Sequence, residues 1–331
     1  MKTQLRRRDD PSPEELEELI EWRRKRFRIL VCIDGSDASF EGLRFAADIG
    51  RSDECDIILC NVRPIDQGLR SGGLQVRLAR ENMLDWGLEL PGMNHLKKGL
   101  EMLIEEGQMS EDWNATTTTQ AVWGDPLGDS KTEYRHESGK SIVLKLKVAP
   151  DAASGILDQY ELGPYNLMIL GEPSRWQGEI SSFWNAGVAQ KVAMLSPCSV
   201  MIARPRNNGK GHLICTDGSE QSLEAARRDA VLAKHCGMPI TLFSVALDRE
   251  ARTKAEETVA RAKAMLDEMQ IEVAETAVGI GDPVEQIVEA GQDHSVIAVS
   301  DSGKSRLKRF LVGSVAFGVM GSSTTSVLNV R

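Results

Sequence analysis

The stretch CIDGSDASFEGLRFAA at residues 32–47 recurs as CTDGSEQSLEAARRDA at residues 215–230, with no gap in the alignment. Chance predicts about one or two identities in such a window, whereas half of these positions are identical. The matching residues are Cys32, Asp34, Gly35, Ser36, Ser39, Glu41, Arg44 and Ala47 in the first copy and Cys215, Asp217, Gly218, Ser219, Ser222, Glu224, Arg227 and Ala230 in the second. The chain therefore contains an internal duplication.

Each copy predicts a strand, a tight turn and a helix. An apolar run, at residues 27–33 in the first half and 212–216 in the second, ends in Asp-Gly-Ser, and helical periodicity follows. Strand and helix patterns then alternate through both halves. That order is typical of an α/β fold with a parallel sheet covered on both faces. Right-handed crossovers place ligand sites at the carboxyl ends of the strands.

The sequence predicts three parts: an N-terminal helical extension at 1–27, a first domain at 28–206 and a second at 207–331. The segment PRNNGKG at 205–211 is the clearest linker. The extension contains a helix that begins at Ser12-Pro13, and it either docks on its own domain or binds a partner. The first domain carries an insert at about 110–145, read as hairpin material with a turn at 137–140, which the second domain lacks.

Composition bounds the class of protein. The 331 residues are 41% hydrophobic and 27% charged, as in an ordinary globular chain, and the net charge of −9 argues against nucleic acid as a general partner. No apolar run is long enough for a membrane span, and none opens the chain as a signal peptide. The six cysteines contain no C-x-x-C pair, which favours buried thiols, a cytoplasmic location and no metal site.

The loop SDSGKSRLKRFLVGS, residues 300–314, is the candidate ligand site. It follows the buried apolar run 295–299 and precedes a predicted helix at 310–320. Unpartnered N–H groups and the macrodipole at a helix N-terminus favour an anion, and the loop itself is basic. A solvated basic surface is the alternative. The loop is no Walker A motif, because Ala298 stands where that motif needs its first glycine.

Both halves resemble the universal stress protein family. The resemblance rests on the first-strand aspartates Asp34 and Asp217, on the glycine loop after the fourth strand, and on the closing strands. Nucleotide-binding members of that family carry Gly-x2-Gly-x9-Gly-Ser/Thr. In the second half Gly303, Gly313 and Ser314 fit this pattern, and Ser300 replaces its first glycine.

In the first half the corresponding pattern is broken. Gly171, Gly178 and Gly187 have the wrong spacing, and Val188 replaces the hydroxyl residue. Glu172 and Glu179 would repel phosphate. We therefore expect this site to be degenerate.

The resemblance implies two open parallel-sheet domains, Rossmann-like and similar to adenine nucleotide alpha hydrolases, arranged as a pseudo-dimer. The closing strands 198–203 and 326–330 would pair within one chain, and a homodimer is left open. The implied ligand is ATP or a related adenine nucleotide, with or without Mg²⁺. The implied site residues are Asp217 beside adenosine, Val245 at adenine, and Ser300, Gly303, Lys304, Arg309, Gly313 and Ser314 at the phosphates.

Each of these roles has a structural alternative. Asp217 also suits a helix-capping turn, and the glycines suit a tight corner between strand and helix. No nucleophile–base pair or carboxylate dyad stands out, so the sequence favours regulatory binding in a stress response over efficient catalysis, with slow ATP hydrolysis left open. Two other functions remain: a nucleotide-free interaction scaffold, and an ATP-using enzyme hinted at by Ser71-Gly72-Gly73.

Overall fold

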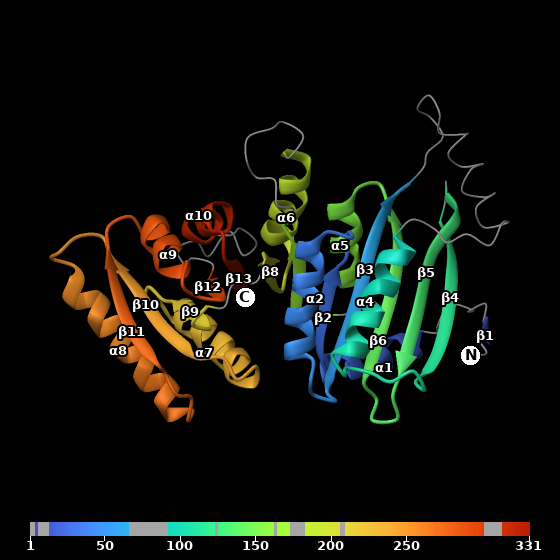
Figure 1. Cartoon of the computed structure of the whole chain (residues 1–331), viewed down its shortest axis with the longest axis horizontal. Helices are drawn as coiled ribbons and strands as arrows, with labels where there is room; N and C mark the ends of the chain where they lie inside the picture. The colour runs from blue at the N-terminus through green and yellow to red at the C-terminus, as the bar shows by residue number, and fades with distance from the viewer. Residues whose placement is uncertain are drawn as a thin grey trace. The chain divides into compact units, whose positions relative to one another are not determined.

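The computed structural model describes residues 4–5, 13–65, 92–122, 125–161, 164–172, 183–205, 209–300 and 313–331. The chain divides into two compact units, Met1–Pro173 and Ser174–Arg331, and each has its own α/β architecture (Figure 1). Within the described ranges, no helix combines the length and the apolar character that a membrane crossing requires.

The first unit is built on parallel strands in the order β6-β3-β2-β7. They are β2 (Phe27–Cys32), β3 (Cys55–Pro64), β6 (Ser141–Ala149) and β7 (Leu167–Gly171). Their connections contain helices α2 (Asp37–Ile49), α4 (Met93–Glu105) and α5 (Ala152–Glu161). The core lies between α2, α4 and the sheet face that carries Ile29, Ile57 and Leu59, which are fully buried. The predicted α/β class is confirmed here.

The sheet of this unit continues beyond β6 as an antiparallel extension. Strand β5 (Asp125–Arg135) pairs with β6, and β4 (Asn114–Val122) pairs with β5, both antiparallel. The short β1 (Gln4–Leu5) then pairs with β4 in parallel. The predicted turn at 137–140 is present, but it joins β6 to β5, a strand that the sequence analysis missed. The segment DPLGDSKTEYR contains proline, glycine and five charges, so it shows no strand pattern. The sequence pattern also predicts helical structure over 74–106 with a break at Pro91-Gly92. Helix α4 forms the part after the break, and residues 74–91 lie outside the described residues.

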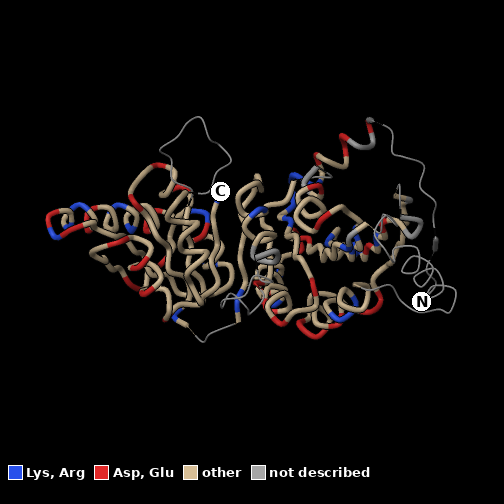
Figure 2. Tube along the Cα trace, turned by 90° about the horizontal axis from the view of Figure 1, so that it is seen from above, with Lys and Arg blue, Asp and Glu red and all other residues tan. Residues whose placement is uncertain are grey.

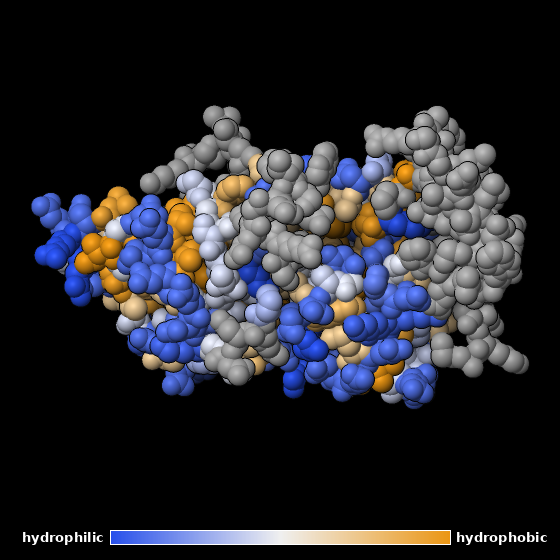
Figure 3. All heavy atoms as spheres, turned by 45° about the horizontal axis from the view of Figure 1, so that its top comes forward, coloured by the Kyte–Doolittle hydropathy of each residue, from blue (hydrophilic) through white to orange (hydrophobic). Residues whose placement is uncertain are grey.

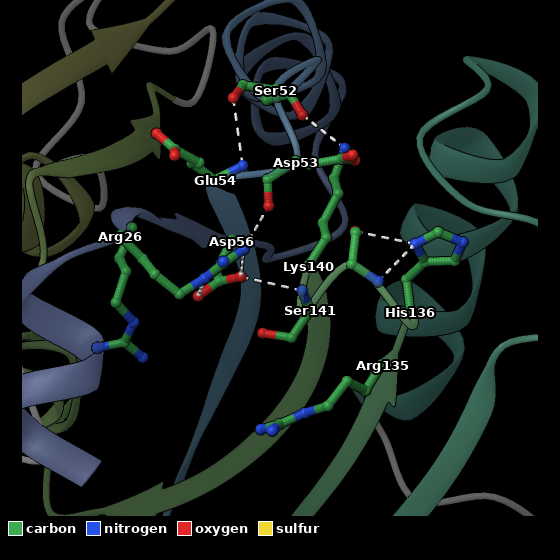
Figure 4. A network of polar contacts seen from close by, with 12 residues as sticks. Arg26, Ser52, Asp53, Glu54, Asp56, Arg135, His136, Lys140 and Ser141 are labelled. Atoms are coloured by element: carbon green, nitrogen blue, oxygen red, sulfur yellow. Dashed lines mark hydrogen bonds and ion pairs between the residues drawn. The ribbon is translucent and has the colours of Figure 1, made fainter. Parts of the chain in front are cut away.

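The N-terminal extension contains helix α1 (Pro13–Arg24), which packs on strand β2 of its own unit. The Trp22 ring lies 5.1 Å from the guanidinium carbons of both Arg26 and Arg135. Arg26 Nε donates to the buried Asp56 carboxylate at 2.8 Å, and Asp56 also accepts from Ser141 N at 2.9 Å (Figure 4). Of the two alternatives for this helix, the docked one is therefore what the structure contains.

The second unit has the strand order β8-β13-β12-β9-β10-β11, parallel except for β8. Its strands are β8 (Ser199–Ala203), β9 (His212–Cys215), β10 (Ile240–Ala246), β11 (Glu275–Ile280), β12 (Val296–Ser300) and β13 (Ser326–Val330). Its helices are α6 (Phe183–Leu195), α7 (Glu220–His235), α8 (Arg252–Glu268), α9 (Pro283–Gly291) and α10 (Ser314–Ser322).

Helices α7 and α8 pack together on one side of this sheet, and α9 and α10 pack together on the other (Figure 1). Acidic and basic residues alternate along α8 (Figure 2), which carries the ion pairs Arg252–Glu256 and Lys263–Asp267. Its opposite side buries small apolar residues such as Ala255 and Val259. Helix α8 is therefore an amphipathic cover with a solvated outer surface.

The predicted pairing of the closing strands is confirmed. Strand β8 runs antiparallel to β13, with Val327 opposite Ile202 and Leu328 opposite Met201. Arg204 strengthens the junction, because its backbone N donates to Ser326 Oγ at 3.0 Å and its Nη1 to Thr325 O at 2.7 Å. This pairing explains why α6 and β8 belong to the second compact unit rather than the first.

Candidate functional site

Both Asp-Gly-Ser turns fold in the same way at the carboxyl end of the first strand of each half. Asp217 Oδ1 accepts a hydrogen bond from Ser219 N at 2.9 Å, and Asp34 Oδ1 accepts one from Ser36 N at the same distance. The following serines cap the helices: Ser219 accepts from Ser222 N, and Ser36 accepts from Ser39 N. Gly35 and Gly218 have φ of +90° and +78°, which glycine adopts without strain.

Asp217 is exposed and its charge is stabilised locally. Burial works to raise the pKa of its carboxyl, but hydrogen bonds from Ser219, Ser222 and the backbone outweigh that effect and lower the pKa. Because Asp34 makes the same turn, these contacts are fully accounted for by the turn itself. A role of Asp217 beside adenosine stays a prediction.

The remaining described candidates lie around one junction of the second sheet. Strands β9 and β12 are neighbours, yet the chain leaves β9 towards α7 and leaves β12 towards α10, on opposite faces. Such a change of direction at the carboxyl edge is where open α/β sheets bind ligands. Ser300 ends β12, half-buried, and Asp217 follows β9. Val245 is half-buried near the end of β10. The three therefore share one edge, whereas Gly303, Lys304 and Arg309 lie outside the described residues.

Helix α10 begins at this edge without a side-chain cap. Its N-cap residue is Gly313, with φ −61° and ψ 151°, and no described side chain bonds to the first turn. Gly313 is buried and Ser314 is exposed. By contrast, α2, α7 and α9 are capped by Ser36, Ser219 and Asp282. The first N–H groups of α10 are therefore suited to an external acceptor.

In the first half, the strand end that corresponds to Ser300 is closely packed by other backbone atoms. By strand register, Gly171 corresponds to Ser300. A Cβ atom at Gly171 would lie 2.3 Å from Ser39 N and 2.7 Å from the carbonyl carbon of Ala38. The end of β7 thus packs directly on the first turn of α2. The glycine is explained by packing, and Glu172 follows it with a carboxylate.

The structure adds residues that the sequence analysis missed. Arg261 of α8 donates through Nη2 to Gly218 O, and Thr258 lies 2.9 Å from a Cβ atom built on Gly218. Both side chains cover the Asp217 turn, and no sequence signal marks them beyond a place on an amphipathic helix. Leu247 follows β10 and is 72% exposed. Figure 3, which turns this edge towards the viewer, shows apolar atoms among hydrophilic ones on the second unit.

Comparison with known proteins agrees with this architecture. Residues 25–204 and 212–331 match the sequence model described as the universal stress protein family. The chain belongs to this family. Its two family segments lie in one polypeptide, as the duplication predicted. No protein of curated function matches the sequence significantly.

Solved structures support the fold over nearly the whole length of this universal stress protein. A universal stress protein from Archaeoglobus fulgidus DSM 4304 aligns with a TM-score of 0.59 at 15% identity, covering 92% of this chain and 96% of that one. One from Pseudomonas aeruginosa UCBPP-PA14 gives 0.52 at 13% identity, covering 94% of each chain. A universal stress protein solved with cAMP gives 0.33 at 24% identity, covering 38% of this chain and 98% of its own.

Proposed function

We propose that this universal stress protein binds ATP or a related adenine nucleotide at the carboxyl edge of its second half. The observation that carries the proposal is the junction of β9 and β12, where the uncapped α10 begins. The first N–H groups of that helix and the Ser314 hydroxyl are the phosphate donors. Asp217 and Val245 stand on the adenosine side of the same edge.

The rest of the phosphate site is assigned from the sequence motif. Gly303 and Gly313 allow close backbone approach, while Lys304 and Arg309 neutralise phosphate charge. Mg²⁺ would accompany ATP on its phosphate oxygens rather than occupy a dedicated protein site. The residue types of the site supply donors and charge, but no nucleophile with its general base. The function is therefore regulatory binding in a cytoplasmic stress response.

A nucleotide-free interaction scaffold is the second candidate. Two residues favour it. Ser300 replaces the first glycine of the motif, and Gly171, the equivalent residue in the first half, serves packing. A scaffold would use the same edge as a protein-binding surface, with Leu247 as an exposed apolar contact. The two candidate functions differ in whether a negative charge at position 314 lowers the affinity for ATP.

The test uses two variants, one with a negative charge at the N-terminus of α10 and one with it at the C-terminus. Ser314→Asp repels phosphate while favouring the positive end of the α10 macrodipole, so we expect at least about a tenfold loss of ATP affinity with stability unchanged or raised. Ser322→Asp is the matched control: it is exposed at the other end of α10 and should lower stability slightly with ATP affinity retained.

Calorimetric titration of ATP with parallel thermal melts measures both properties. Equal ATP affinity in the wild type and Ser314→Asp, with both folded, contradicts the phosphate role. If the wild type does not bind ATP, the interaction scaffold becomes the better-supported function.

A further inference from the structure

A row of cysteine and lysine side chains crosses the sheet of the first unit, which does not carry the proposed nucleotide edge. Cys32 of β2 lies beside Cys60 of β3, and Cys60 lies beside Lys145 of β6. Lys145 in turn lies opposite Lys131 of β5. Neighbouring residues in register point to the same face of a sheet, so these side chains share one face.

Helix α5 packs on this face. A Cβ atom at Gly155 would lie 2.6 Å from Val62 Cγ1, and Val62 is two residues beyond Cys60, on the same side of β3. One turn further along α5, Gln159 is fully buried. Its Nε2 donates to Gly155 O, but its Oε1 has no hydrogen-bond partner among the described residues. The helix that covers this face therefore carries a buried polar group with one atom that no described residue satisfies.

Among the described residues, Lys145 has no counterion, unlike the two other lysines of this face. Lys131 Nζ pairs with Glu133 at 2.5 Å, and Lys147 Nζ pairs with Asp129 at 2.7 Å. Within the described part of the chain, Lys145 Nζ has neither a hydrogen bond nor an ion pair, although the residue is half-buried. An ammonium group in this position is poorly stabilised.

The charged groups that face Lys145 come from several elements and are mostly cationic. The pKa of its ammonium falls from 10.5 to about 8, mainly because of burial, and the Cys60 thiol opposes this fall. Lys131 of β5, Arg23 of α1 and Arg28 of β2 contribute to the same lowering. On α5, Asp158 is exposed. About half of the amine is therefore neutral at pH 8, and the cations around it attract an anion.

We propose that Lys145 is a covalent modification site whose side-chain amine accepts the acyl group of a small acyl phosphate. The neutral Nζ attacks the acyl carbon and forms a C–N bond. The bond from that carbon to the bridging oxygen breaks, and phosphate leaves with its electron pair. The nitrogen then loses a proton to solvent, which leaves an uncharged amide.

Two features select this class of donor. The surrounding Arg and Lys side chains favour a phosphate leaving group over a neutral ester. The half-buried position of Lys145 admits a small reagent and disfavours a bulky one. The amide product carries no charge, so the remaining positive charge of Lys145 is removed from beside Lys131, Arg23 and Arg28.

The experiment uses the native full-length chain, incubated with acetyl phosphate at pH 8 and followed by peptide mass spectrometry. A pKa of about 8 instead of 10.5 raises the neutral fraction more than a hundredfold, while lower basicity and burial reduce the gain. We expect Lys145 to acetylate at least about tenfold faster than the exposed Lys254 of α8. A rate at Lys145 no higher than at Lys254 overturns the proposal.

Further experiments test whether recognition of an anion contributes to the rate, beyond the reactivity of the amine itself. With the neutral donor p-nitrophenyl acetate, or with acetyl phosphate in 0.5 M salt, the preference for Lys145 should fall several-fold because the charge attraction is absent or screened. Lys131→Gln should reduce it as well, since a neighbouring cation is lost. A preference that is equal for both donors and insensitive to salt overturns the acyl phosphate assignment.

Discussion

Glu133 lies on β5 between two cations, and its ionisation makes the stability of the antiparallel extension depend on pH. Burial works to raise the pKa of Glu133, but charge and hydrogen bonding from Lys131 and Arg135 dominate and lower it from 4.5 to about 2. A carboxyl whose folded-state pKa is depressed stabilises the fold above its unfolded value. That contribution is lost as pH falls from about 4.5 to about 2.

Glu133→Gln should therefore destabilise the chain above pH 5, by about 1–2 kcal/mol after allowance for solvent screening. Towards pH 2 the difference from wild type should shrink to near zero. Urea midpoints of both proteins between pH 2 and 6 check this. The control is Glu137→Gln on the neighbouring turn, an exposed position that should follow the wild type throughout. A Glu133→Gln difference that is constant with pH contradicts the prediction.

Single residues also show what the sequence can and cannot predict about the site. The Asp-Gly-Ser turns were predictable because side chain, glycine and cap lie within a few consecutive residues. The packing role of Gly171 was not, because it depends on the backbone of Ser39, far away in the chain. Arg261 was missed for the same reason: its contact with Gly218 O joins a helix to a distant turn.

At the scale of elements, local patterns predicted most of the second unit. The residue pattern at 220–235 predicts a helix, and α7 spans the same residues. Asp282-Pro283 predicts the start of another helix, and Asp282 is the N-cap of α9. The pattern of residues 271–278 predicts a strand, but β11 begins only at Glu275. Gln270 has a positive φ, and Ile271 N still donates to Leu266 O at the helix end. Strand β5 was missed because its place is fixed by β4 and β6 rather than by its own composition.

The pairing of β8 with β13 predicts how the second half behaves in isolation. A fragment of residues 174–331 retains β8, whereas one of residues 207–331 leaves the edge of β13 bare. The shorter fragment loses the buried side chains of Val200, Met201 and Ile202, so we expect it to be at least about 3 kcal/mol less stable and to associate. The longer fragment should be monomeric.

Light scattering and urea unfolding of the two fragments measure this difference. A 207–331 fragment that is strictly monomeric and as stable as the longer one would show that β8 contributes little to the second unit.

At the scale of the whole molecule, the duplication has left two halves with one strand order and different ligand edges. In the first half, the end of β7 is packed on α2 and followed by Glu172. In the second, β12 ends at Ser300, and no described side chain caps α10. A carboxylate repels phosphate, whereas the N–H groups at a helix N-terminus favour it. Following the proposed function, we therefore expect one ATP per chain.

Calorimetric titration of the full chain with ATP measures this stoichiometry directly. The variant Ser314→Asp tests whether the site lies at α10, because it should lose the single site rather than half of the binding. Val188→Ser restores the hydroxyl in the first half as a control, and it should add no second site because Glu172 remains. Two equivalent sites in the wild type would contradict the asymmetry. One site that survives Ser314→Asp would place the nucleotide away from α10, and the divergence between the halves would then need a cause other than phosphate binding.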